Sequence, residues 1–139
     1  QLMKIKEITN FDVVLGPLTS SDKELHLFKS DNRFNVIYNT DKMAELLVQC
    51  DFAVGASGGS TWERLYLQVP SFQFIVSENQ KEISEKLEKS NYVKVIGNLS
   101  NLVPEVEKWI NRELIFRKFD HIDGFGTNRV IKELEKILS

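Results

Sequence analysis

The chain alternates short apolar, β-rich runs with stretches long enough to hold a helix. The runs begin about 17 to 23 residues apart, which leaves room for one helix and two short loops each time. Strands that alternate with helices in this way favour a parallel sheet with helices packed on its faces. The runs are residues 11–16, 34–38, 51–56, 71–76 and 93–97.

The stretches between these runs carry helical periodicity. In residues 40–50, for example, Met43, Leu46, Leu47 and Cys50 recur at i, i+3, i+4 and i+7, and Thr40 is the expected cap. The same reasoning predicts further helices, including a final amphipathic one. These are residues 20–30, 60–68, 80–90, 100–113 and 128–138.

The predicted fold is therefore α/β: a Rossmann-like, three-layer α/β/α arrangement with one parallel sheet of about five to six strands. The 139 residues have the length of one domain, and no linker, repeat or low-complexity tract interrupts them. We expect residues 1–139 to form a single domain cut from a longer protein, because Gln1 is not a natural initiator.

Composition excludes several classes of protein. Hydrophobic residues make up 42% of the chain and charged residues 27%, as in globular proteins, and the net charge of −2 offers no basic surface for nucleic acid. No apolar run approaches the ~18 residues of a membrane span. The single cysteine, Cys50, has no internal disulfide partner and is expected to be a small core residue. Together these features predict a cytoplasmic location, with no nucleic acid and no membrane span as partners.

Residues 51–64 read as a strand, a glycine-rich turn and the start of a helix. The apolar residues 52–54 are typical of a strand covered on both faces. The glycines within 55–59 allow positive φ and close approach of an anion to the peptide N–H groups, and Ser60 or Thr61 would cap the following helix. The spacing matches neither common phosphate-binding fingerprint, so the pattern predicts an anion seat without naming its ligand.

Glu63 has two interpretations. With Ser60 it fits a capping box, in which the carboxylate reaches back to the backbone N–H of Ser60. A carboxylate one turn behind a phosphate loop is also suited to accept hydrogen bonds from a ribose diol. The sequence leaves both open.

Two further loops follow strands at the same predicted edge of the sheet. Tyr38 and Asn39 end one strand and are suited to flank and hydrogen-bond a base, or else to strand-edge packing and a turn. Asn79 and Gln80 follow another strand and are suited to a sugar or phosphate, or else form an ordinary polar loop.

No catalytic group is apparent. The two histidines, His26 and His121, are far apart in sequence and have no metal-ligand pattern around them. No Ser/His/Asp set, Cys/His pair or paired carboxylates can be assembled. We expect a binding site here, without catalytic residues, metal or cofactor.

Several of these segments together resemble the C-terminal domain of the UDP-sugar hydrolase of pseudaminic acid biosynthesis. Related spore-coat polysaccharide proteins and, more distantly, MurG-type glycosyltransferases share the pattern. The resemblance covers most of the chain, from about residue 11 to 130. The segments that carry it are residues 11–17, 39–47, 55–63, 65–70, 78–80 and 123–126.

The resemblance implies the C-terminal, nucleotide-holding half of a GT-B fold, in which two Rossmann-like domains face a cleft. By position, the diphosphate would lie on Gly58, Gly59, Ser60 and Thr61, and Glu63 would hold the ribose.

The resemblance also implies which loops would contact the remaining parts of the ligand. Asn79 and Gln80 would approach the sugar or phosphate, and the uracil would lie near Tyr38, Asn39 and Met43. The expected ligand is thus a UDP-sugar.

The implied activity belongs to a longer protein. A hydrolase or a glycosyltransferase acting at the anomeric carbon would use this domain to hold its donor, while its catalytic base lies in an N-terminal domain before Gln1. The fragment alone would then be inactive. The alternative is a non-catalytic, doubly wound regulatory or scaffold domain whose glycine loop is only a tight turn.

Overall fold

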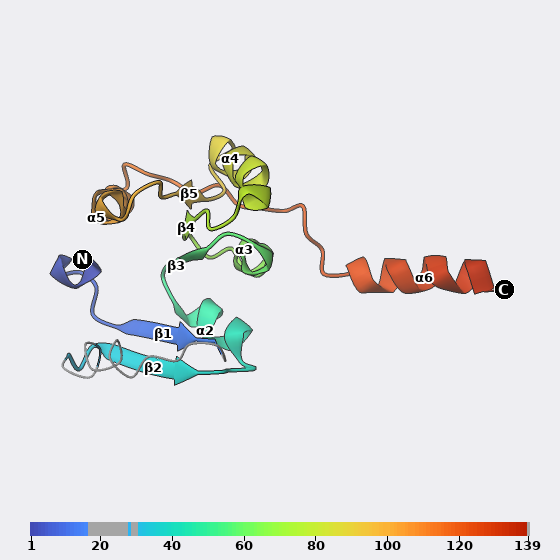
Figure 1. Cartoon of the computed structure of the whole chain (residues 1–139), viewed down its shortest axis with the longest axis horizontal. Helices are drawn as coiled ribbons and strands as arrows, with labels where there is room; N and C mark the ends of the chain where they lie inside the picture. Colours follow the sequence, from blue (N-terminus) through green and yellow to red (C-terminus); the bar gives the residue numbers. More distant parts are fainter. Residues whose placement is uncertain (17–27, 29–30, 139) are drawn as a thin grey trace. The chain divides into compact units, whose positions relative to one another are not determined.

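The structure is a computed structural model that describes residues 1–16, 28 and 31–138. The described residues form an α/β arrangement in which every paired strand runs parallel to its neighbour. Two compact units share the chain (Figure 1). Unit 1 comprises Gln1–Cys50 and Asn98–Leu114, and unit 2 comprises Asp51–Gly97 and Ile115–Ser139.

The expected α/β class and the parallel pairing are confirmed, whereas the single sheet of five to six strands is wrong. The described strands form one sheet in the order β1-β2 and another in the order β3-β4-β5. Apolar runs in a sequence predict strands, but strand pairing is decided by packing between distant segments. This is why the strand positions were predictable and their division into two sheets was not.

Unit 1 is built on the parallel pair β1 (Phe11–Leu15) and β2 (Phe34–Tyr38). Phe11 and Phe34 are register partners, and their rings stack with centroids 4.6 Å apart. Arg33 lies over the Phe11 ring and forms an ion pair with Asp31 at 2.7 Å. The other elements of this unit are η1 (Leu2–Lys4), α2 (Met43–Gln49), η3 (Leu99–Asn101) and α5 (Leu102–Ile110).

Helix α2 confirms the apolar stripe expected from its periodicity. Leu47 is buried, and the other three stripe positions are partly buried. The helix begins at Met43, so Thr40 is not its cap as expected; the Thr40 hydroxyl instead accepts the N–H of Lys42 at 3.0 Å. The helix expected over residues 20–30 falls almost wholly outside the described residues.

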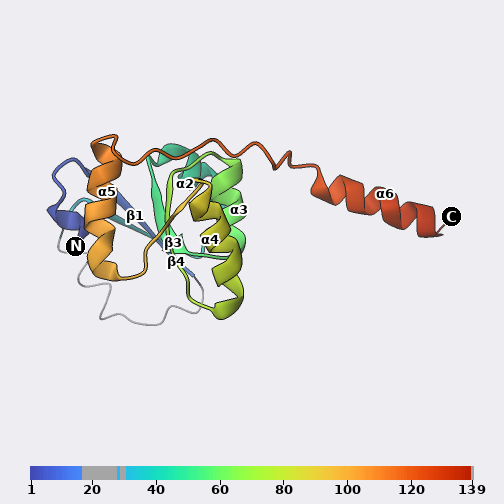
Figure 2. The same ribbon diagram turned by 90° about the horizontal axis from the view of Figure 1, so that it is seen from above.

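Unit 2 contains two successive βαβ turns. Helices α3 and α4 follow β3 and β4 and lie on the same side of the β3-β4-β5 sheet (Figures 1 and 2). This is the arrangement that crossover connections of one hand produce. The elements are β3 (Ala53–Ala56), α3 (Gly59–Tyr66), β4 (Ser71–Phe74), η2 (Glu78–Gln80), α4 (Lys81–Lys89), β5 (Lys94–Val95) and α6 (Gly126–Leu138).

Strand β4 is the buried centre of unit 2. Ser71, Phe72 and Gln73 have no exposed surface, as expected for a central parallel strand. Strand β3 differs, because burial alternates along it and Val54 is 37% exposed. The expectation that β3 is covered on both faces was therefore wrong. The apolar core beside α3 and α4 consists of Leu65, Leu87, Val93 and Phe119.

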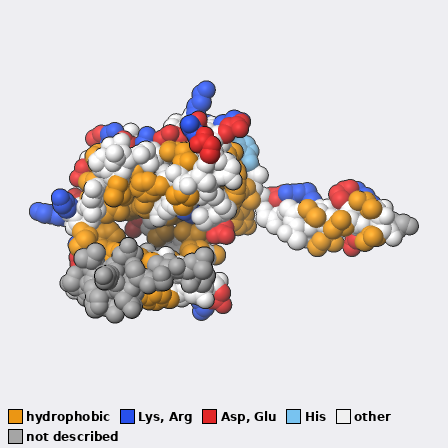
Figure 3. Space-filling view, viewed as in Figure 1, with side chains coloured by type: hydrophobic (Ala, Val, Ile, Leu, Met, Phe, Trp, Pro, Cys, Tyr) orange, Lys and Arg blue, Asp and Glu red, His pale blue; other side chains and the backbone are white. Residues whose placement is uncertain are grey.

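Helix α6 is amphipathic, as its sequence predicts. All of its described residues are exposed, including Val130, Ile131, Leu134 and Ile137. Figure 3 shows apolar and charged side chains together on the visible face of this helix.

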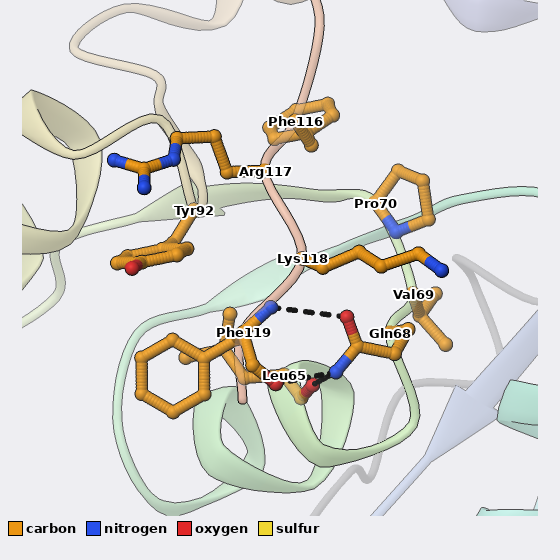
Figure 4. Close-up of a pocket in the computed structure, with 9 residues that line it drawn as sticks. All are labelled: Leu65, Gln68, Val69, Pro70, Tyr92, Phe116, Arg117, Lys118 and Phe119. Atoms are coloured by element: carbon orange, nitrogen blue, oxygen red, sulfur yellow. Dashed lines mark hydrogen bonds between the residues drawn. The ribbon is translucent and has the colours of Figure 1, made fainter. Parts of the chain in front are cut away.

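The segment that follows Leu114 is held on unit 2 by a side-chain clamp. Gln68 has a φ of 61°, and its side-chain amide forms hydrogen bonds with both the backbone N–H and the backbone C=O of Phe119 (Figure 4). Its Nε2 donates to Phe119 O at 2.5 Å and to Leu65 O at 3.1 Å, and its Oε1 accepts the Phe119 N–H at 3.0 Å. The Arg117 N–H adds a bond to Asn91 O. The Gln68 side chain thus satisfies the backbone N–H and C=O of Phe119, as a neighbouring β-strand would.

Replacing Gln68 with alanine removes this clamp and leaves two backbone groups of Phe119 without partners. We expect Gln68→Ala to lower the free energy of unfolding by about 1 to 3 kcal/mol, because several hydrogen bonds to partly buried groups are lost. Hydrogen exchange should quicken at the Phe119 amide. Gln49→Ala, at an exposed position on α2, is the matched control and should change neither quantity. Unchanged exchange at Phe119 in the Gln68 variant would contradict the clamp.

Candidate functional site

The glycine loop joins β3 to α3, as predicted. Gly58 has a φ of 133°, a conformation that side-chain-bearing residues rarely adopt, and it is the N-cap of a helix that begins at Gly59. The expected cap at Ser60 or Thr61 was therefore wrong by two or three residues. Glycine is tolerated at this position because it lets the chain turn sharply out of the strand.

Thr61 completes the cap from inside the helix. Its hydroxyl accepts the N–H of Gly58 at 3.3 Å, and its own N–H donates to Gly58 O at 3.0 Å. Because the helix begins earlier than expected, Glu63 lies beyond the position from which a capping box reaches back. Its carboxylate is exposed and makes no hydrogen bond within the described part of the chain. The capping interpretation of Glu63 is therefore wrong.

Two backbone donors at the start of α3 are open to solvent. Gly59 and Ser60 are exposed, and among the described residues nothing accepts their N–H groups. The first N–H groups of a helix have no partner within it and carry the positive end of its dipole. This geometry suits an anion such as a phosphate group.

The glycine loop and the Asn-Gln loop line one pocket of ≈ 150 Å³. Gln80 is held against the loop, since a Cβ built on Gly58 would lie 3.3 Å from Gln80 Nε2, while Gln80 Oε1 accepts the N–H of Val76 at 3.2 Å. Asn79 Oδ1 accepts the hydroxyl of Ser77 at 2.6 Å. The pocket is lined by Gly58, Thr61, Trp62, Asn79, Gln80, Ile83, Ser84 and Leu87.

The structure thus brings together four of the residues selected from the sequence, Gly58, Thr61, Asn79 and Gln80. Gly59, Ser60 and Glu63 lie on the exposed start of the same helix without lining the pocket.

Tyr38 and Asn39 belong to unit 1. Tyr38 ends β2 and is 53% exposed. Asn39 has a φ of 45° and donates its N–H to Leu15 O at 3.0 Å. This bond continues the pairing of β2 with β1 by one residue beyond Tyr38.

A second pocket of ≈ 130 Å³ lies beside the Gln68 clamp (Figure 4). Pro70, in its lining, directly precedes β4, whereas Gly58 follows the end of β3. Because these strands are parallel, the two pockets lie toward opposite ends of the sheet. Ligands of open parallel sheets bind at the carboxyl ends of the strands, which favours the pocket at the glycine loop.

Three buried polar side chains near the glycine loop were missed by sequence reasoning. Arg64 is 6% exposed, Ser57 is 5% exposed and Gln73 has no exposed surface. An arginine on an amphipathic helix and a glutamine in a strand both read as surface residues. The one signal was Gly55, because a glycine inside a strand often marks the close approach of another group.

The pocket lining contains no histidine, cysteine or carboxylate. No group of three potential metal ligands occurs among the residues that the structure describes. Within the same residues, no helix is both long enough and apolar enough to cross a membrane. Comparison of the chain with family models, curated proteins and solved structures gives no match.

The conformation of Gly58 is directly testable. Gly58→Ala forces a Cβ into a positive-φ position and against Gln80, so we expect a loss of about 1 to 3 kcal/mol in the free energy of unfolding. Gly59→Ala is the matched control, because its Cβ would meet nothing within 4 Å at the start of a helix. That variant should be neutral or slightly stabilising. Equal losses in urea unfolding followed by circular dichroism would argue against a special conformation at Gly58.

Proposed function

We propose that unit 2 binds the diphosphate of a nucleotide sugar at its glycine loop and that the parent protein acts on a UDP-activated sugar. One observation carries this proposal: two loops that follow successive parallel strands place Gly58, Thr61, Asn79 and Gln80 around one pocket. Successive βα loops at the carboxyl edge of a parallel sheet are the usual source of a nucleotide site.

The start of α3 supports the diphosphate assignment. The free N–H groups of Gly59 and Ser60 would donate to phosphate oxygens, and the helix dipole favours the negative charge of those oxygens. The amide side chains of Asn79 and Gln80 line the pocket, and their NH₂ groups are donors that suit a phosphate or a sugar hydroxyl.

Glu63 is suited to the ribose. Its carboxylate is exposed one turn into α3 and has no hydrogen-bond partner in the described part of the chain. A carboxylate is an acceptor only, so it matches the two donor hydroxyls of a ribose diol.

The pocket supports binding rather than chemistry. Its lining offers no group with the acid-base properties of a general base at neutral pH. Cleavage or transfer at the anomeric carbon would take its base from outside this pocket. Unit 2 would hold the UDP leaving group and stabilise its developing charge. Such a division of labour is that of the nucleotide-holding half of a GT-B enzyme.

One observation favours the alternative of a non-catalytic regulatory or scaffold domain. The N–H of Gly58 is already satisfied by the Thr61 hydroxyl at 3.3 Å, as in a turn that closes on itself. That turn shares a pocket with Asn79 and Gln80, and a purely structural turn does not require such a pocket. The donor site is therefore the preferred proposal.

Calorimetric titration with UDP tests the proposal. The unaltered chain should bind UDP, and Glu63→Ala should weaken binding by about tenfold because charge-assisted hydrogen bonds to the ribose are lost. The free energy of unfolding should stay within about 0.5 kcal/mol, since Glu63 caps nothing.

Glu85→Ala, at an exposed position on α4, is the control and should bind UDP as the unaltered chain does. Absence of any UDP-dependent heat or stabilisation in the unaltered chain would sink the proposal. Normal UDP affinity in the Glu63 variant would remove Glu63 from the site.

A further inference from the structure

Arg64 is a buried cation without a carboxylate partner. Its side chain projects from α3 and is 6% exposed, and none of the ion pairs among the described residues includes it. Burial lowers the pKa of the guanidinium, and the nearby charge of Glu63 acts in the opposite direction. Proteins rarely bury a charge without pairing it, because desolvation of an ion is costly. A negatively charged ligand near the guanidinium would offset this cost.

The guanidinium lies directly against the turn from β3 into α3. Its Nη2 donates to Ala56 O at 2.9 Å and to Thr61 Oγ1 at 3.3 Å. A Cβ built on Gly55 would lie 2.9 Å from its Nη1, so the glycine makes room for this group. Arg64 thus stabilises the turn by binding Ala56 and Thr61. These two residues flank the segment of the chain that holds the free N–H groups.

The buried polar atoms that lack partners gather around this same turn. Among the described residues they are Ser57 Oγ, Arg64 Nε and Gln73 Nε2. Gln73 is the register partner of Gly55, and its Oε1 accepts the hydroxyl of Thr61 at 3.0 Å. Two of the three atoms are obligate donors and the third is a hydroxyl that can donate. Buried donors in proteins are usually satisfied, and the oxygen atoms of an anion are acceptors of the kind that these three atoms could use.

We propose that Arg64 is the buried countercharge for the anion bound at the glycine loop, and that it selects phosphate-bearing ligands. This inference rests on the proposed donor site. Arg64 acts as a positioning residue: it fixes Ala56 and Thr61, and its charge raises the potential at the N–H groups of Gly59 and Ser60. The burial of the guanidinium reduces the screening of its charge by water.

The inference predicts that UDP affinity depends on the charge of the side chain at position 64 and not on its shape alone. Arg64→Lys keeps the charge but loses the forked geometry, whereas Arg64→Met keeps much of the volume and loses the charge. UDP affinity should fall about tenfold in the Met variant, as expected for one charge acting over ~10 Å at an effective dielectric constant of ~20. The Lys variant should stay within about threefold of the unaltered chain.

The experiment is calorimetric titration of UDP into the unaltered chain and the variants Arg64→Lys, Arg64→Met and Arg64→Gln, each at several NaCl concentrations. The affinity of the unaltered chain should fall more steeply with salt than that of the neutral variants, because salt screens charge but not packing. Thermal unfolding reports whether each variant is folded. If the Met variant does not fold, the Gln variant, which keeps an amide donor for Ala56 O, tests the same loss of charge.

The outcomes separate this inference from the proposed function. If the unaltered chain does not bind UDP, the donor site itself is overturned. If the chain binds UDP and the folded neutral variants bind it equally well, the donor site stands and the role of Arg64 is overturned. A Lys variant as weak as the Met variant would assign the effect to the hydrogen-bond fork and overturn the charge inference.

Discussion

The hydroxyl of Thr61 joins the three segments on which the candidate site depends. It accepts the N–H of Gly58 and one N–H of Arg64, and it donates to Gln73 Oε1 in the neighbouring strand. One donor and two acceptor positions are all that a hydroxyl offers, so each is in use. The start of α3, the turn before it and strand β4 are thereby held in one arrangement, and the pocket beside Gln80 follows from it.

Local patterns in the sequence predicted the elements better than their association. The run at residues 34–38 matches β2, and the stripe ending at Cys50 matches the inward side of α2. The period of apolar residues fixes such features within a few residues. The pairing of strands depends on contacts between distant segments, which no local pattern contains, so the sequence predicted one sheet where the described strands form two.

The sequence predicted those parts of the candidate site whose positions follow from the order and direction of the strands. Loops that follow parallel strands must emerge at one edge, and this rule placed the glycine loop near Asn79 and Gln80. The helix start was not predictable, since serine and threonine are stronger cap residues than Gly58, which nevertheless caps α3. This shift of the helix start excludes the capping interpretation of Glu63. The burial of Arg64 was not predictable, because it results from packing against a glycine in another element.

An arginine is the cation best suited to such a position. Lysine carries its charge on a single ammonium group, whereas the guanidinium of Arg64 directs its N–H groups in a plane toward Ala56 and Thr61. A buried charge that forms no ion pair lowers the stability of the fold, and a bound anion offsets that cost. Ligand binding and stability are then coupled, because a ligand that binds only the folded chain shifts the folding equilibrium toward it. The same residue that weakens the empty fold would make it selective for phosphate.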